Sequence, residues 1–345
     1  MLTLFGRWAR PKLTSPVWGS SLGLARTLLA AGTLGTLVFT DPAALMSPLA
    51  NGVVPPTCAG VTQAGIWCVT PSLVWGRWIS VAVLLAVASG WRPRLTAIPH
   101  WYVSWSLIVN ATVQDGGDQI TAVLTLLLIP ICLADRRRWH WSPSTPDPAE
   151  PGTRQIVGRV ALLLIQIQVA AIYLHASIAK LGVPEWADGT AMFYWSRHPT
   201  FGAPAWLRPV MDPILGSPYG VTAVTWGSVA LEFALAIAIF LGPQAKRFLL
   251  GAGLLFHTGI AVHMGLVSFL AATSAALLLA LLPAGHNAGW LSRMGKELAR
   301  LHREAMQSRG RLFSAPAQAA APTVSPASGP ASPTSARVTQ PAGRR

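Results

Sequence analysis

The chain has 345 residues, of which 52% are hydrophobic and only 11% are charged. Soluble domains carry about 25% charged residues, so this composition leaves too little polar surface to keep a chain of this size in solution. The net charge of +14 would suit a nucleic-acid-binding protein, but the basic residues lie between and beyond long apolar runs instead of forming one basic domain. The composition therefore predicts an integral membrane protein that binds no nucleic acid and has the lipid bilayer as a partner.

Eight apolar runs are candidates for membrane-spanning helices. A span perpendicular to the bilayer needs about 20 residues, and the third, fourth and eighth runs fall furthest short of this length. The runs are continuously apolar and lack the alternation of a half-buried strand, so we expect an all-α fold, a polytopic helical bundle. The predicted spans are Leu22–Phe39, Leu73–Gly90, His100–Val113, Gln119–Ala134, Ile156–Ser177, Val221–Leu241, Phe248–Leu266 and Val267–Leu282.

Lysine and arginine are concentrated in every second connection between these runs. The basic connections contain Arg7, Arg10, Lys12, Arg92, Arg94, Arg136, Arg137, Arg138, Arg154, Lys246 and Arg247. With eight spans, all of these residues fall on one side of the membrane. Because cytoplasmic connections carry the excess of Lys and Arg, both termini are predicted to be cytoplasmic.

The sequence after the last run changes character twice. Apolar residues first recur at helical spacing among basic ones, which predicts an amphipathic helix on the inner membrane surface. The end of the chain is rich in Ala, Pro and Ser, so we expect it to be disordered. The predicted segments are a cytoplasmic N-terminal segment (1–21), a transmembrane domain (22–283), a basic amphipathic interfacial helix (284–312) and a disordered tail (313–345).

Two loops on the predicted external side carry local signals. Cys58 and Cys68 flank a short loop and can form a disulfide bond if that loop faces an oxidising compartment, so their pairing stays open. In the turn DGGD, Asp118 is expected to cap the fourth helix. Cys132 lies in an apolar run and is expected to pack as a small hydrophobic residue.

The fifth run is more polar than the others and is followed by a lysine. Gln166, Tyr173 and Lys180 are seven residues apart and therefore lie on one face of a helix, whereas His175 lies on the opposite face. Such a helix either forms hydrogen bonds with neighbouring helices or lines a cavity, because polar groups that face lipid are costly. Lys180 either extends to the lipid headgroups or, in a partly dry pocket, acts as a base.

An aromatic, irregular stretch follows Lys180 and contains several titratable residues. Glu185, Asp188 and His198 lie there among tryptophan, tyrosine and phenylalanine side chains. This mixture suits a half-buried cap over the external mouth of the bundle, or an aromatic belt at the membrane interface. We therefore include Glu185 and Asp188 among the candidate catalytic residues.

Three more titratable residues lie within the predicted spans. Glu232 and His257 fall near the middles of the sixth and seventh spans. A carboxylate at this depth is costly unless it is neutral or paired, so we expect a structural Glu232–His257 pair, with a proton relay as the alternative. His263 lies about 9 Å further toward the external side at 1.5 Å per residue, which places it closer to Lys180. No metal site is predicted, since His257 and His263 do not share a helix face and no typical metal-binding spacing occurs.

The run IYLHASIAKLGVPEWADGTAMFYWSRHPTFG, residues 172–202, resembles the core signature of the HTTM (horizontally transferred transmembrane domain) family. That family includes the vitamin K-dependent gamma-carboxylase. Within it, the run is similar to the HAxxAKLxVPEWxDGTAxYYW pattern of the sporulation-delaying protein B family. The segments DGGDQITAVLTLLLIPICLADRRRWHW and FHTGIAVHMGL also resemble that family. The resemblance covers roughly residues 22–283 and implies an HTTM-like transmembrane domain.

The resemblance implies roles for individual residues. In the carboxylase, a lysine at the matching end of this helix is the base that starts the vitamin K reaction, and it matches Lys180. The tryptophan and glycine that follow match Trp186 and Gly189. Gln119 stands where the carboxylase has a functional histidine, and the chain lacks the large luminal domain that holds the carboxylase's protein substrate, so vitamin K carboxylation is not expected. Members of the sporulation-delaying protein B family act in maturing a secreted peptide toxin together with a small partner protein.

The sequence thus leads to one preferred function and two alternatives. The preferred reading is a multi-pass protein of the bacterial cytoplasmic membrane that matures or exports a secreted antimicrobial peptide, with the peptide precursor and a small accessory protein as partners. One alternative is a quinone- or lipid-linked membrane enzyme with Lys180 as base, where the quinone cofactor is implied by resemblance only. The other is a non-catalytic immunity or chaperone-like partner. The candidate catalytic residues are Lys180, His175, Glu185, Asp188 and His263, and the candidate structural residues are Glu232, His257, Cys58 and Cys68.

Overall fold

The computed structural model of the protein describes residues 17–142, 152–287 and 289. Regular structure within these ranges is helical, without any β-strand, and one isolated bridge pairs Trp91 with Trp139. The all-α prediction is confirmed for this part of the chain. Most of the predicted N-terminal segment, nearly all of the interfacial helix and the whole tail lie outside the described residues. All described residues belong to the first of two compact units, Met1–Gly289.

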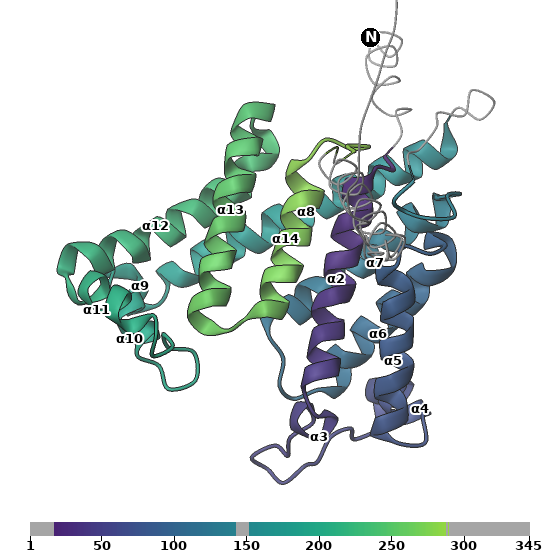
Figure 1. The fold of residues 1–345 in the computed structure, drawn as a ribbon, viewed down its shortest axis with the longest axis horizontal. Helices are drawn as coiled ribbons and strands as arrows, with labels where there is room; N and C mark the ends of the chain where they lie inside the picture. Colours follow the sequence, from purple (N-terminus) through teal and green to yellow (C-terminus); the bar gives the residue numbers. More distant parts are fainter. Residues whose placement is uncertain (1–16, 143–151, 288, 290–345) are drawn as a thin grey trace, which may run out of the picture. The chain divides into compact units, whose positions relative to one another are not determined.

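Each predicted span coincides with a helix of the structure (Figure 1). The helices at these positions are α2 (Ser20–Phe39), α5 (Leu73–Ala88), α6 (Pro93–Asn110), α7 (Gly116–Ala134), α8 (Thr153–Leu181), α12 (Pro218–Ile237, extended by η2, Ala238–Phe240), α13 (Pro243–Met264) and α14 (Val267–Leu281). Shorter helices lie in the connections: α3 (Pro42–Leu45), η1 (Gly60–Ala64), α4 (Ile66–Val69), α9 (Pro184–Ala187), α10 (Ala191–Ser196) and α11 (Arg208–Gly216).

Among the described helices, five are long and apolar enough to cross a membrane: α2, α7, α8, α12 with η2, and α13. Two more, α5 and α14, are apolar but shorter. The helix α8 has 29 residues, which corresponds to about 43 Å at 1.5 Å per residue and exceeds the apolar thickness of a bilayer. The prediction of a helical membrane protein is therefore supported, while the count of eight spans and the orientation stay predictions.

Six of the eight predicted helix starts differ from the structure by two to seven residues, and two of these differences have a clear local reason. The third span was expected to begin at His100, but α6 begins at Pro93, since proline fits the first turn of a helix, where no backbone donor is needed. The fourth helix was expected to have Asp118 as its cap. Instead α7 begins at Gly116, with Asp115 as the N-cap and Asp118 completing a capping box in which each side chain accepts a hydrogen bond from the other residue's backbone N–H.

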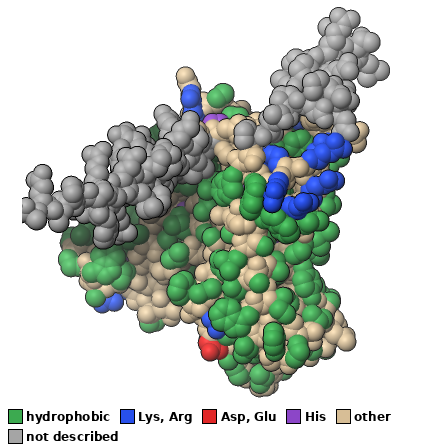
Figure 2. All heavy atoms as spheres, turned by 45° about the vertical axis from the view of Figure 1, so that its right-hand side comes forward, with side chains coloured by type: hydrophobic (Ala, Val, Ile, Leu, Met, Phe, Trp, Pro, Cys, Tyr) green, Lys and Arg blue, Asp and Glu red, His purple; other side chains and the backbone are tan. Residues whose placement is uncertain are grey.

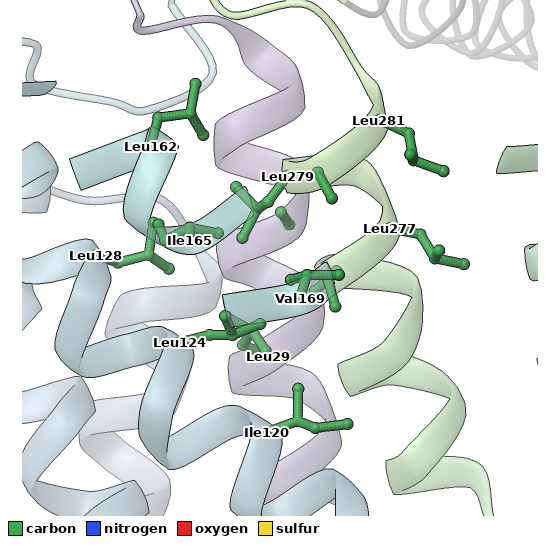
Figure 3. Close-up of a cluster of buried hydrophobic side chains, with 14 of the residues drawn as sticks. Leu29, Ile120, Leu124, Leu128, Leu162, Ile165, Val169, Leu277, Leu279 and Leu281 are labelled. Carbon is green, nitrogen blue, oxygen red and sulfur yellow. The ribbon is translucent and has the colours of Figure 1, made fainter. Parts of the chain in front are cut away.

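The main hydrophobic core lies where α2, α7, α8 and α14 meet (Figure 3). Leu29 of α2, Leu124 of α7 and Ile165 of α8 are fully buried there, and Leu277 of α14 is 1% exposed. A second cluster joins α2 to α4, α5 and α6. The helix α2 therefore contributes to both clusters and lies between α5 and α14 (Figure 1).

The outer surfaces of the helices remain apolar. On the face shown in Figure 2, hydrophobic side chains cover the length of the helices, and Lys and Arg side chains gather near one end. On α8 alone, Val160, Leu164, Ile167 and Ile178 are exposed. In water such a surface would be unfavourable, whereas hydrocarbon accepts it, so the exposed faces suit a bilayer.

Candidate functional site

A buried charged pair joins the last turn of α8 to the middle of α12. The Nζ of Lys180 donates to both carboxylate oxygens of Glu232, at 2.8 Å from Oε1 and 2.6 Å from Oε2. The side chains are only 23% and 9% exposed. A third hydrogen bond from Nζ reaches the carbonyl oxygen of Ala176 at 3.4 Å, and the Trp186 ring lies 5.3 Å away in a cation–π contact. The ammonium group thus has a partner for each of its three protons.

This geometry corrects the expected Glu232–His257 pair. The Nδ1 of His257 lies 2.7 Å from the carbonyl oxygen of Gly253 and therefore donates to it. The Nε2 of His257 is then free to accept a hydrogen bond, and the hydroxyl of Tyr173, 3.5 Å away, is the donor. The physical reason is the packing of α12 against α8, which brings Lys180 to Glu232 as the opposite charge. The sequence had suggested that the partner of Glu232 comes from α13, because α13 directly follows the helix of Glu232 along the chain.

A cavity of about 540 Å³ lies on one side of the pair and is lined largely by α7, α8 and α14. We call it the polar cavity, because its walls include several hydrogen-bonding side chains. These are Gln119, Gln168, Tyr173, His175, Lys180, Glu232, His257 and Thr273. Lys180 and His175, which helical periodicity had placed on different faces, line the same cavity.

A second cavity, of about 570 Å³, lies on the other side of the pair. We call it the apolar cavity, because all its lining residues other than Lys180, Glu232 and Ser228 are apolar. Its aromatic and sulfur-containing walls are formed by Trp186, Met192, Trp195, Phe201, Phe256, Met264 and Phe269. Lys180, Glu232 and Phe269 line both cavities, so the charged pair and one aromatic ring lie where the two cavities adjoin.

Gly189 brings the segment after Lys180 onto α12. It has a φ of +85°, which favours glycine, and an added Cβ would lie 3.0 Å from Thr222 and 3.1 Å from Trp226. The resemblance had singled out this glycine, and its positive φ together with its close approach to α12 disfavours a larger residue. It fixes the start of α10, whose Met192 then lines the apolar cavity.

The structure does not bring the other candidate catalytic residues to the pair. Glu185 and Asp188 are exposed, and the Oδ1 of Asp188 accepts hydrogen bonds from the backbone N–H and the hydroxyl of Thr190. His263 is buried near the end of α13 and lines neither cavity. Asp188 therefore has a local structural explanation, and the site is centred on Lys180 and Glu232.

Sequence reasoning missed the part that Phe269 has in the site. Nothing in its own helix distinguishes this phenylalanine, since α14 is apolar all round. Gln168, from the same helix as Lys180, also lines the polar cavity. The one sequence feature connected with Phe269 is the glycine pair of the DGGD turn. These two glycines pack against Phe269, although nothing in the sequence says which residue they meet.

The cysteines behave as structural residues. Cys58 and Cys68 form a disulfide bond between the loop before η1 and α4. Cys132 is free, 2% exposed and part of the main core. None of the three lines either cavity, so the disulfide supports the fold at a distance from the charged pair.

A second group of buried polar residues lies outside the two cavities. Arg26 of α2 is 2% exposed and donates to the hydroxyl of Thr96 at 2.6 Å. In the connection after α7, the Nε2 of His140 lies 3.3 Å from the hydroxyl of Thr27. Burial, together with the positive charges of Arg26 and Arg137, lowers the pKa of His140 to about 3. His140 is therefore neutral at physiological pH.

These features define a class of protein, a polytopic helical membrane protein with a buried charged pair between two cavities. No family model and no solved structure matches the chain. It is 36% identical over 270 residues to the uncharacterized protein YitO of Bacillus subtilis (strain 168), covering 77% of this chain and 86% of that protein. It is 35% identical over 285 residues to the sporulation-delaying protein SdpB of the same strain, covering 81% of this chain and 87% of SdpB. The chain belongs to the SdpB family.

Proposed function

We propose that this protein acts in the maturation or export of a secreted antimicrobial peptide, with Lys180 and Glu232 at its working site. Kinship with a sporulation-delaying protein supports the biological setting. The observation that carries the proposal is the charged pair itself, since a buried pair between two cavities is a costly arrangement for stability alone. The peptide precursor and a small accessory protein are the partners in this proposal.

The pair supplies both members of a proton-transfer couple. Transfer of one proton from the Nζ of Lys180 to Oε2 of Glu232, over 2.6 Å, turns the ion pair into a neutral amine and a neutral carboxylic acid. The neutral amine then has a lone pair with which it takes a proton from a substrate group, while Glu232 keeps the first proton.

The same proposal places the protein in the bacterial cytoplasmic membrane with eight spans and both termini inside. The connections after α5 and α7, both rich in arginine, lie together: the backbone N–H of Arg92 donates to the carbonyl of Arg138 at 2.7 Å. Arg77, near the other end of α5, donates to the carbonyls of Leu37 and Val38. This arrangement suits a membrane orientation in which the two arginine-rich connections face the cytoplasm.

Reporter fusions test this orientation. Alkaline phosphatase is active only outside the cytoplasm, so a fusion after Pro204 should be active and a fusion after Arg138 inactive. Membrane abundance of each fusion is measured as the control. The reverse pattern, or activity at both positions, would contradict the eight-span topology.

Substitution of Lys180 tests the function, with the mass of the secreted peptide as the readout. Lys180→Ala and Lys180→Arg should both abolish maturation while the protein remains inserted in the membrane. Arginine keeps the positive charge but does not deprotonate near neutral pH, so it separates a base from a simple cation. The matched control is Lys246→Ala, since Lys246 contacts the carbonyl of Ile239 and lines neither cavity.

The outcomes of this experiment discriminate among the candidate functions. Full maturation in Lys180→Arg alone would reduce Lys180 to an electrostatic role. Full maturation in both variants would favour the non-catalytic immunity or chaperone-like partner.

The apolar cavity beside Lys180 favours a second candidate, a lipid- or quinone-linked enzyme of the HTTM type with Lys180 as base. In that case the membrane lipids or quinones, and not the peptide, should change in mass in the Lys180→Ala strain. Gln119 lines the polar cavity at the position that matches a functional histidine of the carboxylase. This difference argues against carboxylation itself.

A further inference from the structure

Phe269, in the first turn of α14, is the one aromatic residue that lines both cavities within the described part of the chain. Its ring lies 5.6 Å, between centroids, from the ring of His257 on the polar side. With Lys180 and Glu232 it forms the boundary between the two spaces. A single ring therefore stands beside the charged pair where a polar and an apolar compartment meet.

The DGGD turn at the start of α7 holds Phe269 in place. A Cβ added at Gly117 would lie 2.7 Å from the Cα of Phe269 and 3.0 Å from its N, so only glycine allows this approach. A Cβ at Gly116 would lie 3.3 Å from Cε2 of the ring. The hydroxyl of Ser268 donates to Oδ2 of Asp115 at 2.6 Å. The turn thus does more than cap α7: it fixes the backbone from which the dividing ring projects.

The apolar cavity has open space on the α12 side. Gly227 lines it, and a Cβ added there would meet no atom within 4 Å. Met192 and Trp195 of α10 and Phe201 of the connection between α10 and α11 extend its wall beyond the spans. Methionine and aromatic side chains adapt to varied apolar groups and commonly anchor peptide segments. The wall of this cavity therefore includes adaptable side chains that lie outside the predicted spans.

We propose that the two cavities are the two halves of one binding site for an apolar peptide segment, and that Phe269 is the specificity-determining residue that separates them. This inference rests on the proposed function. Apolar side chains of the precursor occupy the apolar cavity. The adjoining backbone amides face Gln119, Gln168 and His175 in the polar cavity, whose side chains offer both donors and acceptors. The protein thus recognises an apolar stretch of the substrate, and this stretch lies next to the substrate group that contacts Lys180.

Filling the apolar cavity tests the substrate half of this inference. Gly227→Phe should lower the yield of mature secreted peptide, per molecule of inserted protein, by about tenfold or more, because a filled pocket rejects the side chains that it normally takes. Gly227→Leu should have a smaller effect in the same direction. The matched control is Gly259→Phe, since Gly259 is also a helical glycine with open space around its Cβ position but lines neither cavity. Normal yield in both Gly227 variants would overturn the inference.

Thiol accessibility tests the dividing role of Phe269 without any assumption about function. In a Cys132→Ala background, Leu231→Cys places the reactive thiol in the apolar cavity. Neutral N-ethylmaleimide should react with it, and a cationic methanethiosulfonate reagent should react slowly, because a charge enters an apolar space at high cost. Phe269→Ala should speed the cationic reagent by about tenfold, as the polar cavity then reaches the thiol. Phe256→Ala is the control, since Phe256 lines the apolar cavity alone.

The two experiments separate failure of this inference from failure of the proposed function. Normal maturation in the Lys180 variants would reject the function, while the thiol rates would still decide whether Phe269 divides the site. Loss of maturation in the Lys180 variants with normal yield in Gly227→Phe would reject only the peptide segment in the apolar cavity. Equal rates of the cationic reagent in Phe269→Ala and Phe256→Ala would overturn the dividing role.

Discussion

Lys180 and Arg26, two basic residues of the described helices, are removed from solvent to different degrees and in different surroundings. Lys180 is paired with a carboxylate and has a cavity on each side. Arg26 donates to a threonine hydroxyl, and neither of the two cavities reaches it. A charge beside open space can meet a substrate, whereas a charge enclosed by packed side chains can only support the fold. Burial of a basic residue is therefore a weaker sign of function than burial beside a cavity.

The Arg26 region is closed by the connection that follows α7. His140 of this connection packs where glycines leave room: a Cβ at Gly23 would lie 2.8 Å from its ring, and one at Gly90 2.5 Å. The backbone N–H of His140 donates to the carbonyl of Gly90 at 2.9 Å. The glycines and the histidine together make this region compact. The Lys180 region, in contrast, borders two cavities.

The largest expected effect comes from breaking the charged pair. Glu232→Gln leaves the Lys180 charge buried without its counterion and should lower the free energy of unfolding by about 3–5 kcal/mol. The double variant Lys180→Met with Glu232→Leu should recover most of this stability, because apolar residues of similar volume often replace a buried pair without loss. It should nevertheless fail to mature the peptide. Unfolding by denaturing detergent and the mass of the secreted peptide measure the two effects.

Measuring both effects separates the contribution of the charged pair to stability from its contribution to function. A double variant that is stable and also matures the peptide would show that the pair has only a structural role. A single variant as stable as the parent protein would show that Lys180 is not effectively buried. Either result would remove the distinction between the two regions.

A smaller effect is expected at Arg26. Arg26→Ala should lower the free energy of unfolding by about 2–5 kcal/mol, because it removes a large buried side chain and leaves a cavity. Arg26→Met fills much of the same volume without a buried charge and should cost less. Peptide maturation per inserted molecule should be unchanged in both variants. Loss of maturation in Arg26→Met at normal abundance would contradict the purely structural role.

The smallest effect concerns pH and His140. Its pKa is about 3 in the folded protein, against an ordinary value of about 6.5 in the unfolded chain. Below pH 6.5 the unfolded state therefore binds a proton that the folded state does not, so stability is fully present above this pH and falls as the pH drops toward 3. Thermal unfolding in detergent between pH 7.5 and 4 should show this decline.

His140→Gln tests the origin of the decline by its slope. Removing the titrating group should flatten the pH dependence of the unfolding temperature, whatever the variant's stability at pH 7.5. The exposed His198 provides the control, and His198→Gln should keep the slope of the parent protein. An unchanged slope in His140→Gln would assign the pH dependence to other groups.

Membership in a membrane class and the approximate positions of the helices could be read from the sequence, which also singled out Lys180 as a candidate residue. Each depends on local information: apolar runs set the helices, and the motif around AKLGVPEWADG marked the end of α8. The helix starts at α6 and α7 were misplaced because proline and the capping box allow polar residues into a first turn. Such errors are local and leave the order of helices intact.

Which residues of different helices contact one another was decided only by the tertiary structure. Lys180 and Glu232 are separated by 52 residues, and Asp115 and Ser268 by 153. Helical periodicity tells which residues of one helix share a face, but not which helix that face meets. That choice depends on how all the helices pack together, and it paired Glu232 with Lys180 instead of His257. For the same reason Phe269, an unremarkable residue of an apolar helix, became the boundary of the site only once α14 packed against the glycines of α7.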